Sequence, residues 1–429
     1  MALMLKNAHL IDPQVGLDKV TGIVIEDGKI KEITDVEPEG AEVIDLSGKI
    51  LVPGLVDAHV HLREPGFEYK EDIASGTRSA ARGGFTEVCA MPNVDPCIDD
   101  AVGVEYVKAI AEKHGKCKVA VSGACTKEQG GEILADIGDM YAHGVRVFTD
   151  DGRGVQKAGI MRLVMDYASQ FDCTIMVHAQ DESLAGDGQV NEGVVSTRLG
   201  MLGWPAEAEE IEIERDISLS RLSGCPLHVQ HITTARGLEL VKRAKEEGLN
   251  VTCEVTPHHM FLCEDDIDDN YPTNLKVNPP LRTKEDCEAL IQGVIDGSVD
   301  MIATDHAPHA DYEKDREFEL APFGMTGLES ALGAVITNLV STGKISYNKL
   351  VELMSVNPRK LLHEEAVKLE AGSVADLTVF DPDETWVVGE DGYVSKAHNC
   401  GFDGVALKGR ATDVFVNGIS TLRDGKICD

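Results

Sequence analysis

Residues 57–64 of the chain read DAHVHLRE. Side chains on a β-strand alternate between two faces, so His59, His61 and Arg63 are expected on one face, with apolar residues on the other. The two imidazoles would lie roughly 6.6 Å apart along the backbone, close enough to converge on one ion. A lone His-x-His pair is equally typical of buried histidines that only satisfy backbone partners. The interpretation therefore depends on the rest of the chain.

The same kind of segment recurs. Eight apolar runs of strand length each end in polar residues, and helical patterns such as residues 207–224 and 237–248 separate most of them. Strands of this kind alternating with helices predict an α/β fold, a parallel (β/α)8 TIM barrel. We interpret the acidic stretch 207–214 as the solvent-facing side of one covering helix. The runs are LVPGLVDAHVH (51–61), FTEVCAMPN (85–93), CKVAVSGACT (117–126), VRVFTDDG (145–152), CTIMVHAQD (173–181), PLHVQHIT (226–233), NVTCEVTPHH (250–259) and VDMIATDHAPH (299–309).

Both ends of the chain have a different character. Short alternating runs broken by Asp-Gly and Ser-Gly turns, such as TGIVIEDGKIKEI, fill the first 50 residues, and VADLTVFDPDETWVV repeats this style near the end. Such patterns indicate hairpins. We predict that the two termini, residues 1–50 and 366–429, form one small β-sandwich domain beside a metal-dependent barrel of residues 51–365.

Composition excludes several classes of partner. A formal charge of −34 over 429 residues disfavours nucleic acid and anionic membrane surfaces, because both attract a surplus of Lys and Arg. An anionic substrate would need local cations such as Arg63. No run reaches 18 apolar residues, and we expect neither a signal peptide nor a membrane span. The eleven cysteines form no C-x-x-C pair, and this usage favours a reducing cytoplasm.

Polar residues end most of the predicted strands. In barrels of this type, functional groups gather where the carboxyl ends of the strands meet, so we expect these side chains at one mouth. Four histidines and two aspartates at matching strand ends predict a metal site rather than a set of unrelated core residues. The residues are His59 and His61 on the first strand, Asn93 on the second, Asp150 and Asp151 on the fourth, His178 on the fifth, His231 on the sixth and Asp305 on the eighth.

The number of ligands favours two ions. His59, His61 and Asp305 would hold one ion, and His178 with His231 would hold the other. A bridging carboxylate would come from FTDDG, either Asp150 or Asp151, and we prefer Asp151 because it lies nearer the mouth. Imidazole and carboxylate suit Zn²⁺ best, with Co²⁺ or Mn²⁺ as alternatives.

This chemistry suits hydrolysis of an amide. Metal ions make water a strong nucleophile at neutral pH, and Asp305 beside it can carry a proton to the leaving nitrogen. Arg63 offers a planar fork for a substrate carboxylate. Directional hydrogen bonds would come from Asn93, Asn278 and His309, and backbone groups from the loop APFG, residues 321–324. His258 and His259 remain ambiguous, and we leave them outside the metal site.

With these residues assembled, the chain resembles the amidohydrolase superfamily and, within it, the dihydroorotases of the bacterial single-function type. The motifs that carry the resemblance are GLVDAHVHLREPG, AMPN, FTDDG, VNEG, HVQHIT, VNPPLR, ATDHAPH and APFGMTGLE. The resemblance implies a barrel with a small β domain and the interconversion of N-carbamoyl-L-aspartate and L-dihydroorotate in pyrimidine biosynthesis. It implies zinc ligands His59, His61, Asp151, His178, His231 and Asp305, with Asp151 bridging and Asp305 as the catalytic acid/base. It implies substrate contacts from His61, Arg63, Asn93, Asn278, His309, Phe323 and Gly324. We also expect a cytoplasmic homodimer, with aspartate carbamoyltransferase as a further candidate partner.

The expected metal bridge differs from that of many superfamily members, which use a carboxylated lysine at the end of strand 4, whereas VRVFTDDG has no lysine there.

Two alternatives to a dihydroorotase stay open. A hydantoinase or allantoinase is the nearest rival, although an uncharged hydantoin has no use for Arg63. A non-catalytic scaffold that supports a partner is the other, although such chains are expected to lose ligands and this one keeps them.

Overall fold

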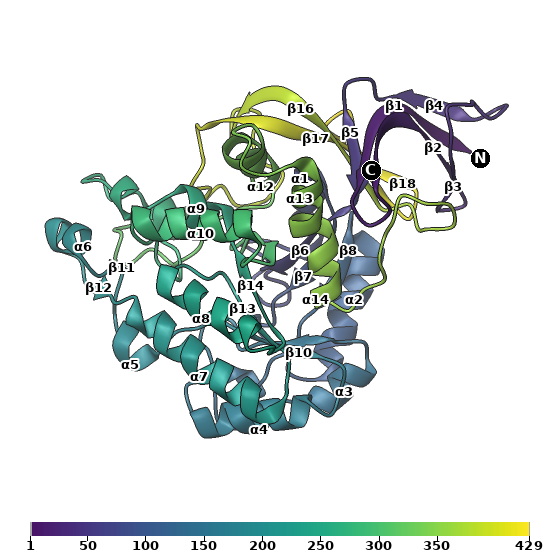
Figure 1. Ribbon diagram of the computed structural model, residues 1–429. Helices are drawn as coiled ribbons and strands as arrows, with labels where there is room; N and C mark the ends of the chain where they lie inside the picture. The colour runs from purple at the N-terminus through teal and green to yellow at the C-terminus, as the bar shows by residue number, and fades with distance from the viewer. Residues whose placement is uncertain (1, 429) are drawn as a thin grey trace.

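Strands from the two ends of the chain lie side by side. The computed structural model describes residues 2–428, and the strands of both ends pair in one nine-stranded sheet in the order β19-β18-β17-β16-β5-β1-β2-β3, with β4 beside β1. Figure 1 shows the purple N-terminal strands next to the yellow C-terminal ones. The predicted pairing of the two ends is therefore observed. The strands are β1 (Leu3–Asp12), β2 (Leu17–Glu26), β3 (Lys29–Ile33), β4 (Glu42–Asp45), β5 (Ile50–Pro53), β16 (Leu377–Val387), β17 (Ala406–Val416), β18 (Ile419–Arg423) and β19 (Lys426–Ile427).

The middle of the chain forms parallel sheets. One sheet has the order β6-β7-β8 and another the order β15-β14-β13-β10-β9, and all their pairings are parallel. Parallel bridges between Gly123 and Phe148 and between Val60 and His306 join the two sheets at both edges. The pairing thus passes through all eight predicted segments and returns to β6. These strands are β6 (Leu55–Val60), β7 (Phe85–Ala90), β8 (Lys118–Val121), β9 (Val147–Phe148), β10 (Thr174–Val177), β13 (Leu227–Val229), β14 (Val251–Val255) and β15 (Met301–Ile302).

The first predicted run, residues 51–61, is two strands rather than one. β5 belongs to the terminal sheet, the chain turns at Gly54, and β6 enters the parallel sheet. A Cβ on Gly54 would lie only 2.2 Å from Oγ1 of Thr86, so glycine is required where the chain changes sheets. β6 ends at Val60, so His61 lies just beyond the strand. Arg63, with a φ of 62°, lies in the turn that follows, where strand alternation does not set the direction of the side chain.

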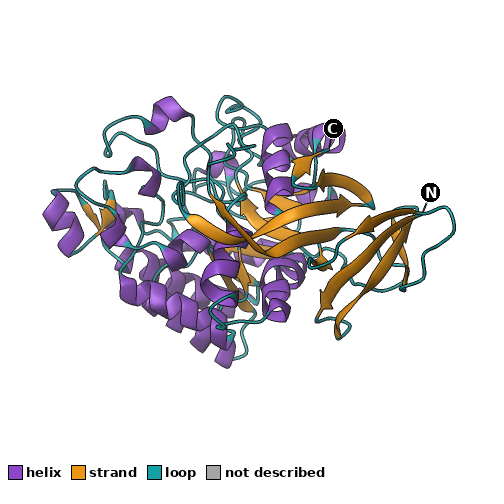
Figure 2. Ribbon diagram, turned by 90° about the horizontal axis from the view of Figure 1, so that it is seen from above, coloured by secondary structure: helices purple, strands orange, loops and turns teal. Residues whose placement is uncertain are grey.

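Helices follow most of the parallel strands and cover the sheet, as Figure 2 shows in purple. Side-chain caps mark several N-termini: Asp72 before α1, Asp100 before α2, Thr234 before α8 and Thr283 before α10 each accept backbone N–H groups. In the range 2–428, no helix is long and apolar enough to cross a membrane. The α-helices are α1 (Ile73–Gly83), α2 (Ala101–His114), α3 (Ile137–Ala142), α4 (Ala158–Ala168), α5 (Glu182–Ala185), α6 (Val194–Leu199), α7 (Glu207–Ser223), α8 (Ala235–Glu246), α9 (Pro257–Phe261), α10 (Lys284–Asp296), α11 (Asp311–Lys314), α12 (Ala331–Val335), α13 (Tyr347–Val351) and α14 (Asn357–Leu361). Two short strands, β11 (Val190–Asn191) and β12 (Gly203–Trp204), pair with each other beside α5 and α6.

The interpretation of residues 207–214 as a solvent-facing side is wrong for two glutamates of α7. Glu209 and Glu212 are only 2% and 1% exposed. Glu209 accepts the backbone N–H groups of Thr233 and Thr234 at 2.9 and 3.1 Å, just before α8 begins. Glu212 pairs with Arg215 at 2.8 Å and so faces inward with a counter-charge. Both carboxylates are buried because polar partners inside the molecule replace water.

A buried ion pair ties α14 to the parallel sheet. Nη1 of Arg359 lies 2.7 Å from Oε2 of Glu87 on β7, and both residues are less than 5% exposed. The same guanidinium donates to the carbonyl of Gly54 and to the hydroxyl of Thr86, both at 3.2 Å. The pair therefore anchors the point where the chain passes from β5 to β6.

Removing the carboxylate of this buried ion pair should lower the stability of the fold far more than removing one from an ion pair at the surface. Glu87→Gln leaves the Arg359 charge buried without a counter-charge, and we expect a loss of about 3 kcal/mol in the free energy of unfolding. The control is Asp166→Asn on α4, which breaks an exposed pair with Arg162 at 3.3 Å and should cost below about 0.5 kcal/mol. Denaturant titration measures both changes. Equal losses in the two variants would contradict the anchoring role.

Candidate metal centre and active site

The polar residues predicted at the strand ends line one cavity. It has a volume of about 160 Å³ and opens to solvent at the carboxyl ends of the parallel strands. His59 and Asp150 are the exceptions, since neither lines the cavity and both are buried. The lining comprises His61, Arg63, Asn93, Asp151, Gly152, His178, His231, Asn278, Asp305, Ala307, His309, Phe323 and Gly324.

The carboxylate of Asp151 lies at the centre of four imidazoles. Its Oδ1 is 3.3 Å from Nε2 of His59, 3.4 Å from Nδ1 of His178 and 3.7 Å from Nε2 of His231. Its Oδ2 is 3.4 Å from Nε2 of His61. Two groups that could each hold a metal ion, His59–His61–Asp151 and Asp151–His178–His231, therefore share this one residue.

Asp150 is occupied elsewhere. Its Oδ1 accepts the backbone N–H groups of Cys125 and Thr126 at 2.8 and 3.0 Å, and its Oδ2 accepts the hydroxyl of Thr126. Burial raises the pKa of this carboxyl to about 6, and these hydrogen bonds limit the rise. The sequence left the bridging aspartate open between two neighbours, and the geometry brings only Asp151 among the histidines.

Asp305 lies beside the first group of ligands. Its Oδ1 is 3.0 Å from Nε2 of His61 and 3.6 Å from Nε2 of His59. Burial alone would raise the pKa of Asp305, but the hydrogen bond from His61 and the nearby His59 lower it below its ordinary value. The residue is thus held as a carboxylate, the form that can accept a proton.

The buried polar atoms that lack partners fit a bound cation. Nε2 of His59 and Oδ1 of Asp151 have no hydrogen bond although both are buried, a rare condition in folded proteins. Nδ1 of His178 and Nε2 of His231 face each other at 2.9 Å, so two ring nitrogens converge on one point. Imidazole nitrogens and a carboxylate are the donors that Zn²⁺ prefers. The residues present therefore fit a metal ion.

Three of the four histidines have a fixed partner on the ring nitrogen that faces away from Asp151, whereas Nδ1 of His231 has none among the described residues. Nδ1 of His59 pairs with Oε1 of Glu254 at 2.7 Å, Nδ1 of His61 with Oδ1 of Asn93 at 2.8 Å, and Nε2 of His178 with Oε1 of Gln180 at 2.9 Å. Such partners orient histidines toward a metal. The sequence analysis missed Glu254 and Gln180. A charged residue inside the apolar strand NVTCEVTPHH was the available signal for Glu254.

Electrostatics favour positive charge between Asp151 and Glu254. Burial lowers the pKa of His59, yet the two carboxylates outweigh it and raise that pKa well above its ordinary value. Burial raises the pKa of Glu254, but His59 and then His228 hold it well below its ordinary value. A cation at this place is therefore stabilised from both sides.

The specificity residues predicted from the sequence lie along the cavity wall. Nε of Arg63 donates to the carbonyl of Pro308 at 3.1 Å, and its Nη2 lies 3.4 Å from Nε2 of His309. Nε2 of His309 also lies 2.8 Å from the carbonyl of Phe323, while Nδ1 lies 3.2 Å from Nζ of Lys70. Burial and then the charge of Arg63 lower the pKa of His309, so its ring is neutral. A neutral ring that accepts from Lys70 donates to Phe323.

Three site residues have unusual backbone geometry. Arg63, His231 and Asp305 have φ values of 62°, 28° and 46°, in the left-handed region that residues other than glycine rarely adopt. Each such residue costs on the order of 1–3 kcal/mol and persists only where surrounding structure enforces it. All three lie two or three residues beyond the end of a parallel strand, namely β6, β13 and β15. The turn that ends each strand therefore aims the side chain into the cavity.

His258 and His259 lie apart from this group. His259 pairs with the hydroxyl of Thr256 at 2.8 Å and with the carbonyl of Pro279 at 2.9 Å. Burial lowers the pKa of His258 to about 4, and neither ring belongs to a group of potential metal ligands in the described chain.

Comparisons with known proteins agree with this geometry. The family model "Dihydro-orotase-like" matches residues 48–236. The solved L-hydantoinase (dihydropyrimidinase) from Arthrobacter aurescens superimposes with a TM-score of 0.88 at 26% identity, over 100% of this chain and 97% of that one. D-hydantoinase from a Thermus species shares the fold, with a TM-score of 0.85 at 23% identity over 99% of this chain and 96% of that one.

Sequence relatives are considerably closer. The dihydroorotase of Acetivibrio thermocellus is 44% identical over 423 residues, covering 98% of this chain and 99% of the relative. That of Ruminiclostridium cellulolyticum is 44% identical over 424 residues, covering 99% of each chain. With this identity over nearly its whole length, the chain belongs to the dihydroorotase family.

Proposed function

We propose that the chain catalyses the dihydroorotase reaction, the reversible hydrolysis of the cyclic amide of L-dihydroorotate to N-carbamoyl-L-aspartate in pyrimidine biosynthesis. The observation that carries the proposal is the Asp151 carboxylate, which lies within 3.7 Å of four imidazoles beneath an open cavity. The 44% identity to named dihydroorotases supports the choice of substrate.

Zinc is the proposed metal, with two ions favoured. His59, His61 and Asp305 would hold one, His178 and His231 the other, and Asp151 would bridge them. Bound there, zinc would supply a Lewis acid that polarises the amide carbonyl and makes water acidic enough to attack it at neutral pH. All four imidazoles are buried, and Glu254, Asn93 and Gln180 hold those of His59, His61 and His178, so these ligand atoms need little rearrangement.

Asp305 is the proposed catalytic acid/base. The carboxylate is ionised, lies 3.0 Å from His61 and lines the cavity, so it can take a proton from the attacking water. In the ring-opening direction it would then return this proton to the amide nitrogen as the C–N bond breaks. In the reverse direction the same carboxylate would remove the proton from that nitrogen.

The substrate carboxylate is assigned to Arg63, with Asn93, Asn278 and His309 as further contacts. Oδ1 of Asn278 has no partner although it is buried, and its amide nitrogen is held by Gln180 at 3.0 Å. Most backbone groups of Phe323 and Gly324 already have partners. The Gly324 N–H donates to the carbonyl of Lys276, and the Gly324 carbonyl accepts from Nζ of Lys314. The Phe323 carbonyl pairs with Nε2 of His309. The Phe323 N–H has no partner within residues 2–428. We assign this group to the substrate.

The hypothesis of a hydantoinase is less consistent with the site than that of a dihydroorotase. The solved neighbours named hydantoinases share 26% identity or less, whereas named dihydroorotases share 44%. A hydantoin ring carries no carboxylate, so the charge of Arg63 in the cavity wall would have no substrate anion to bind. A scaffold without catalysis is also disfavoured, because every proposed metal ligand and Asp305 are retained.

We infer a (β/α)8 barrel from the circuit of eight parallel strands. The division expected from the sequence assigns residues 51–365 to it, with residues 1–50 and 366–429 as the second unit. We propose to move the first boundary to Gly54, because β5 (Ile50–Pro53) pairs within the terminal sheet. The sandwich of the second unit would arise from folding of the single terminal sheet over one apolar cluster that includes Leu5, Leu10, Ile23, Leu377 and Phe415. We further propose a homodimer in the cytoplasm, with aspartate carbamoyltransferase as a candidate partner.

Metal removal should abolish activity reversibly. Protein dialysed against a strong chelator should lose turnover of dihydroorotate and regain it when zinc is added, as measured by absorbance and by metal analysis of the same samples. In Asp151→Asn, both sites lose a shared ligand charge, so we expect zinc affinity to fall by at least about tenfold. Full activity in metal-free protein would refute the metal-dependent mechanism.

Asp305→Asn removes the proposed proton carrier while keeping the side-chain size. We expect kcat to fall by about 10³-fold, within the range that general acid–base groups contribute. Metal content must be determined in parallel, because Asp305 is also a proposed ligand. The exposed Asp311→Asn serves as the control and should retain wild-type kcat. An Asp305→Asn enzyme with bound zinc and undiminished kcat would exclude the assigned role.

Arg63→Met tests the substrate class. Loss of a charge-assisted, paired hydrogen bond to the carboxylate should lower kcat/KM for dihydroorotate by about 100-fold, with zinc content unchanged. The matched control is Arg153→Met, since Arg153 is exposed just beyond Asp151 and should tolerate the change. A panel of dihydroorotate, hydantoin and allantoin, assayed on one preparation, separates the alternatives. Preference for hydantoin in the wild type would overturn the assignment.

A further inference from the structure

Two lysines are buried next to the loop that covers the cavity. Lys276 precedes Asn278 in the chain, and Lys314 is the last residue of α11. Their exposed fractions are only 2% and 5%. Lysine is almost never this buried unless its charge is paired.

The partners of both ammonium groups are backbone carbonyls of one segment, residues 318–324. Nζ of Lys276 donates to Phe318 and Glu319 at 2.8 and 3.0 Å. Nζ of Lys314 donates to Pro322 and Gly324, both at 2.9 Å. Two cations thus hold four carbonyls within seven residues of chain.

Neither lysine has a carboxylate partner. No ion pair within 4.0 Å involves Lys276 or Lys314 in the part of the chain that the structure describes. Burial lowers the pKa of Lys276 to about 8, and burial followed by the charge of Lys276 lowers the pKa of Lys314 to about 7. An arrangement that only stabilised the fold would be expected to include an acid, since unpaired buried charge is costly.

The held segment carries the groups that face the cavity. The Gly324 N–H donates to the carbonyl of Lys276 at 2.8 Å, and Nζ of Lys276 lies 4.5 Å from the ring centroid of Phe323. Gly324 has a φ of 131°, and a Cβ there would lie 2.8 Å from Cβ of Ala307, so the segment runs directly against the cavity wall. Movement of the 318–324 segment would displace the Phe323 N–H and the carbonyl that pairs with His309.

We propose that Lys276 and Lys314 are positioning residues that clamp the 318–324 segment over the substrate, so that Phe323 and His309 meet the bound dihydroorotate in fixed geometry. This inference rests on the proposed function for the identity of the substrate, but the clamp itself is a property of the free protein. Neither lysine lines the cavity, and both act through the segment they hold.

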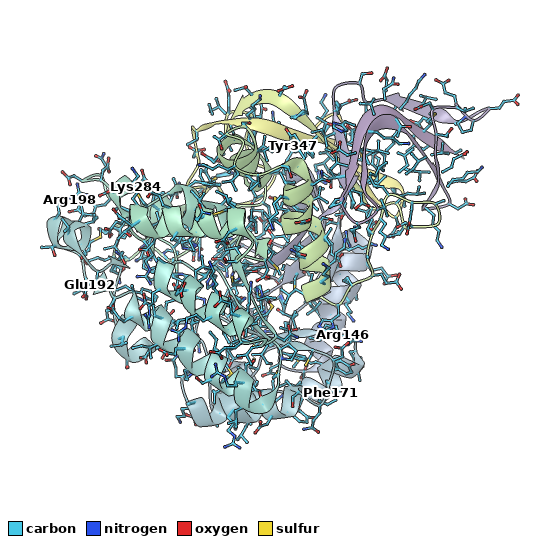
Figure 3. The ribbon with its side chains drawn as sticks, in the orientation of Figure 1. Arg146, Phe171, Glu192, Arg198, Lys284 and Tyr347 are labelled. Carbon is cyan, nitrogen blue, oxygen red and sulfur yellow. The ribbon has the colours of Figure 1, made fainter. Side chains whose placement is uncertain are left out.

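The test compares Lys276→Met and Lys314→Met with Lys284→Met in the full-length zinc-loaded protein. Methionine keeps most of the length of the side chain and removes its donors. Lys284, labelled in Figure 3, is exposed at the start of α10 and provides the control. The measurements are hydrogen–deuterium exchange by mass spectrometry, steady-state kinetics with dihydroorotate, thermal unfolding and zinc content.

For both clamp variants we expect exchange of peptides within residues 316–324 to accelerate by about tenfold or more, with other regions unchanged. KM for dihydroorotate should rise by about tenfold while kcat changes by less than about threefold and zinc content stays the same, because the metal ligands are untouched. The control should match the wild type in every measurement. If a methionine variant does not fold, Lys314→Gln keeps one donor and should show the same changes at smaller size.

Folded variants with wild-type exchange in residues 316–324 would overturn the clamp, and so would faster exchange across the whole protein, which indicates a merely structural role. A different outcome separates the clamp from the proposed function. If the wild-type protein fails to turn over dihydroorotate but the variants show accelerated exchange confined to residues 316–324, the proposed function is refuted and the clamp is supported.

Discussion

Everything at this site depends on a carboxylate that has no ordinary reason to be buried. Asp151 is 3% exposed and one of its oxygens lacks any hydrogen bond, while four imidazoles approach it within 3.7 Å. An isolated buried charge is expensive, and the raised pKa of His59 shows that Asp151 and Glu254 favour positive charge beside them. Metal cations between the carboxylate and the rings would supply that charge. The residues are therefore arranged to stabilise positive charge at this point.

The surrounding framework keeps these ligands in place. Parallel strands bring residues distant in sequence to one edge, and the left-handed turns at Arg63, His231 and Asp305 aim their side chains inward. Behind the rings, the carboxylate of Glu254 contacts both His59 and His228. It also accepts the backbone N–H of His231 at 3.4 Å, which links two ligand strands. Glu212 accepts the N–H of Gln180 at 3.1 Å, so the hydrogen-bond network from His178 continues into α7. The site is thus connected to its covering helices by polar contacts as well as by packing.

Much of this arrangement was predictable from the sequence. Apolar runs with polar ends indicated the eight strands, because burial on both faces leaves a clear signal, and the residues at their ends do lie together. The choice of Asp151 over Asp150 came from nearness to the mouth, and the structure shows the other reason, which is that Thr126 and Cys125 occupy Asp150. The division of the first run at Gly54 was missed because both halves are apolar, although the Pro53-Gly54 dipeptide was an available turn signal.

Other features depend on contacts between distant segments and leave no local pattern. Glu212 occupies a position in an acidic run that looks solvent-facing, yet Arg215 and Gln180 draw it inward. Lys276 and Lys314 are 38 positions apart and carry no motif, so their shared segment becomes visible only in three dimensions. The backbone N–H and carbonyl of Gly324 likewise bond to Lys276, Lys314 and Asn399, which all lie outside the motif APFGMTGLE.

The position of β5 has a consequence for how the molecule is made. This strand lies between β1 and β16 and leads through Gly54 directly into the strand that bears His59. During synthesis from the N-terminus, one edge of β5 waits for β16, which begins only at Leu377. Contacts this remote in sequence form slowly, because a long loop must first close. The strand that leads into the first ligand-bearing strand is therefore paired only after β16 has been synthesised, more than 300 residues later, and the catalytic centre is fully assembled only after that point.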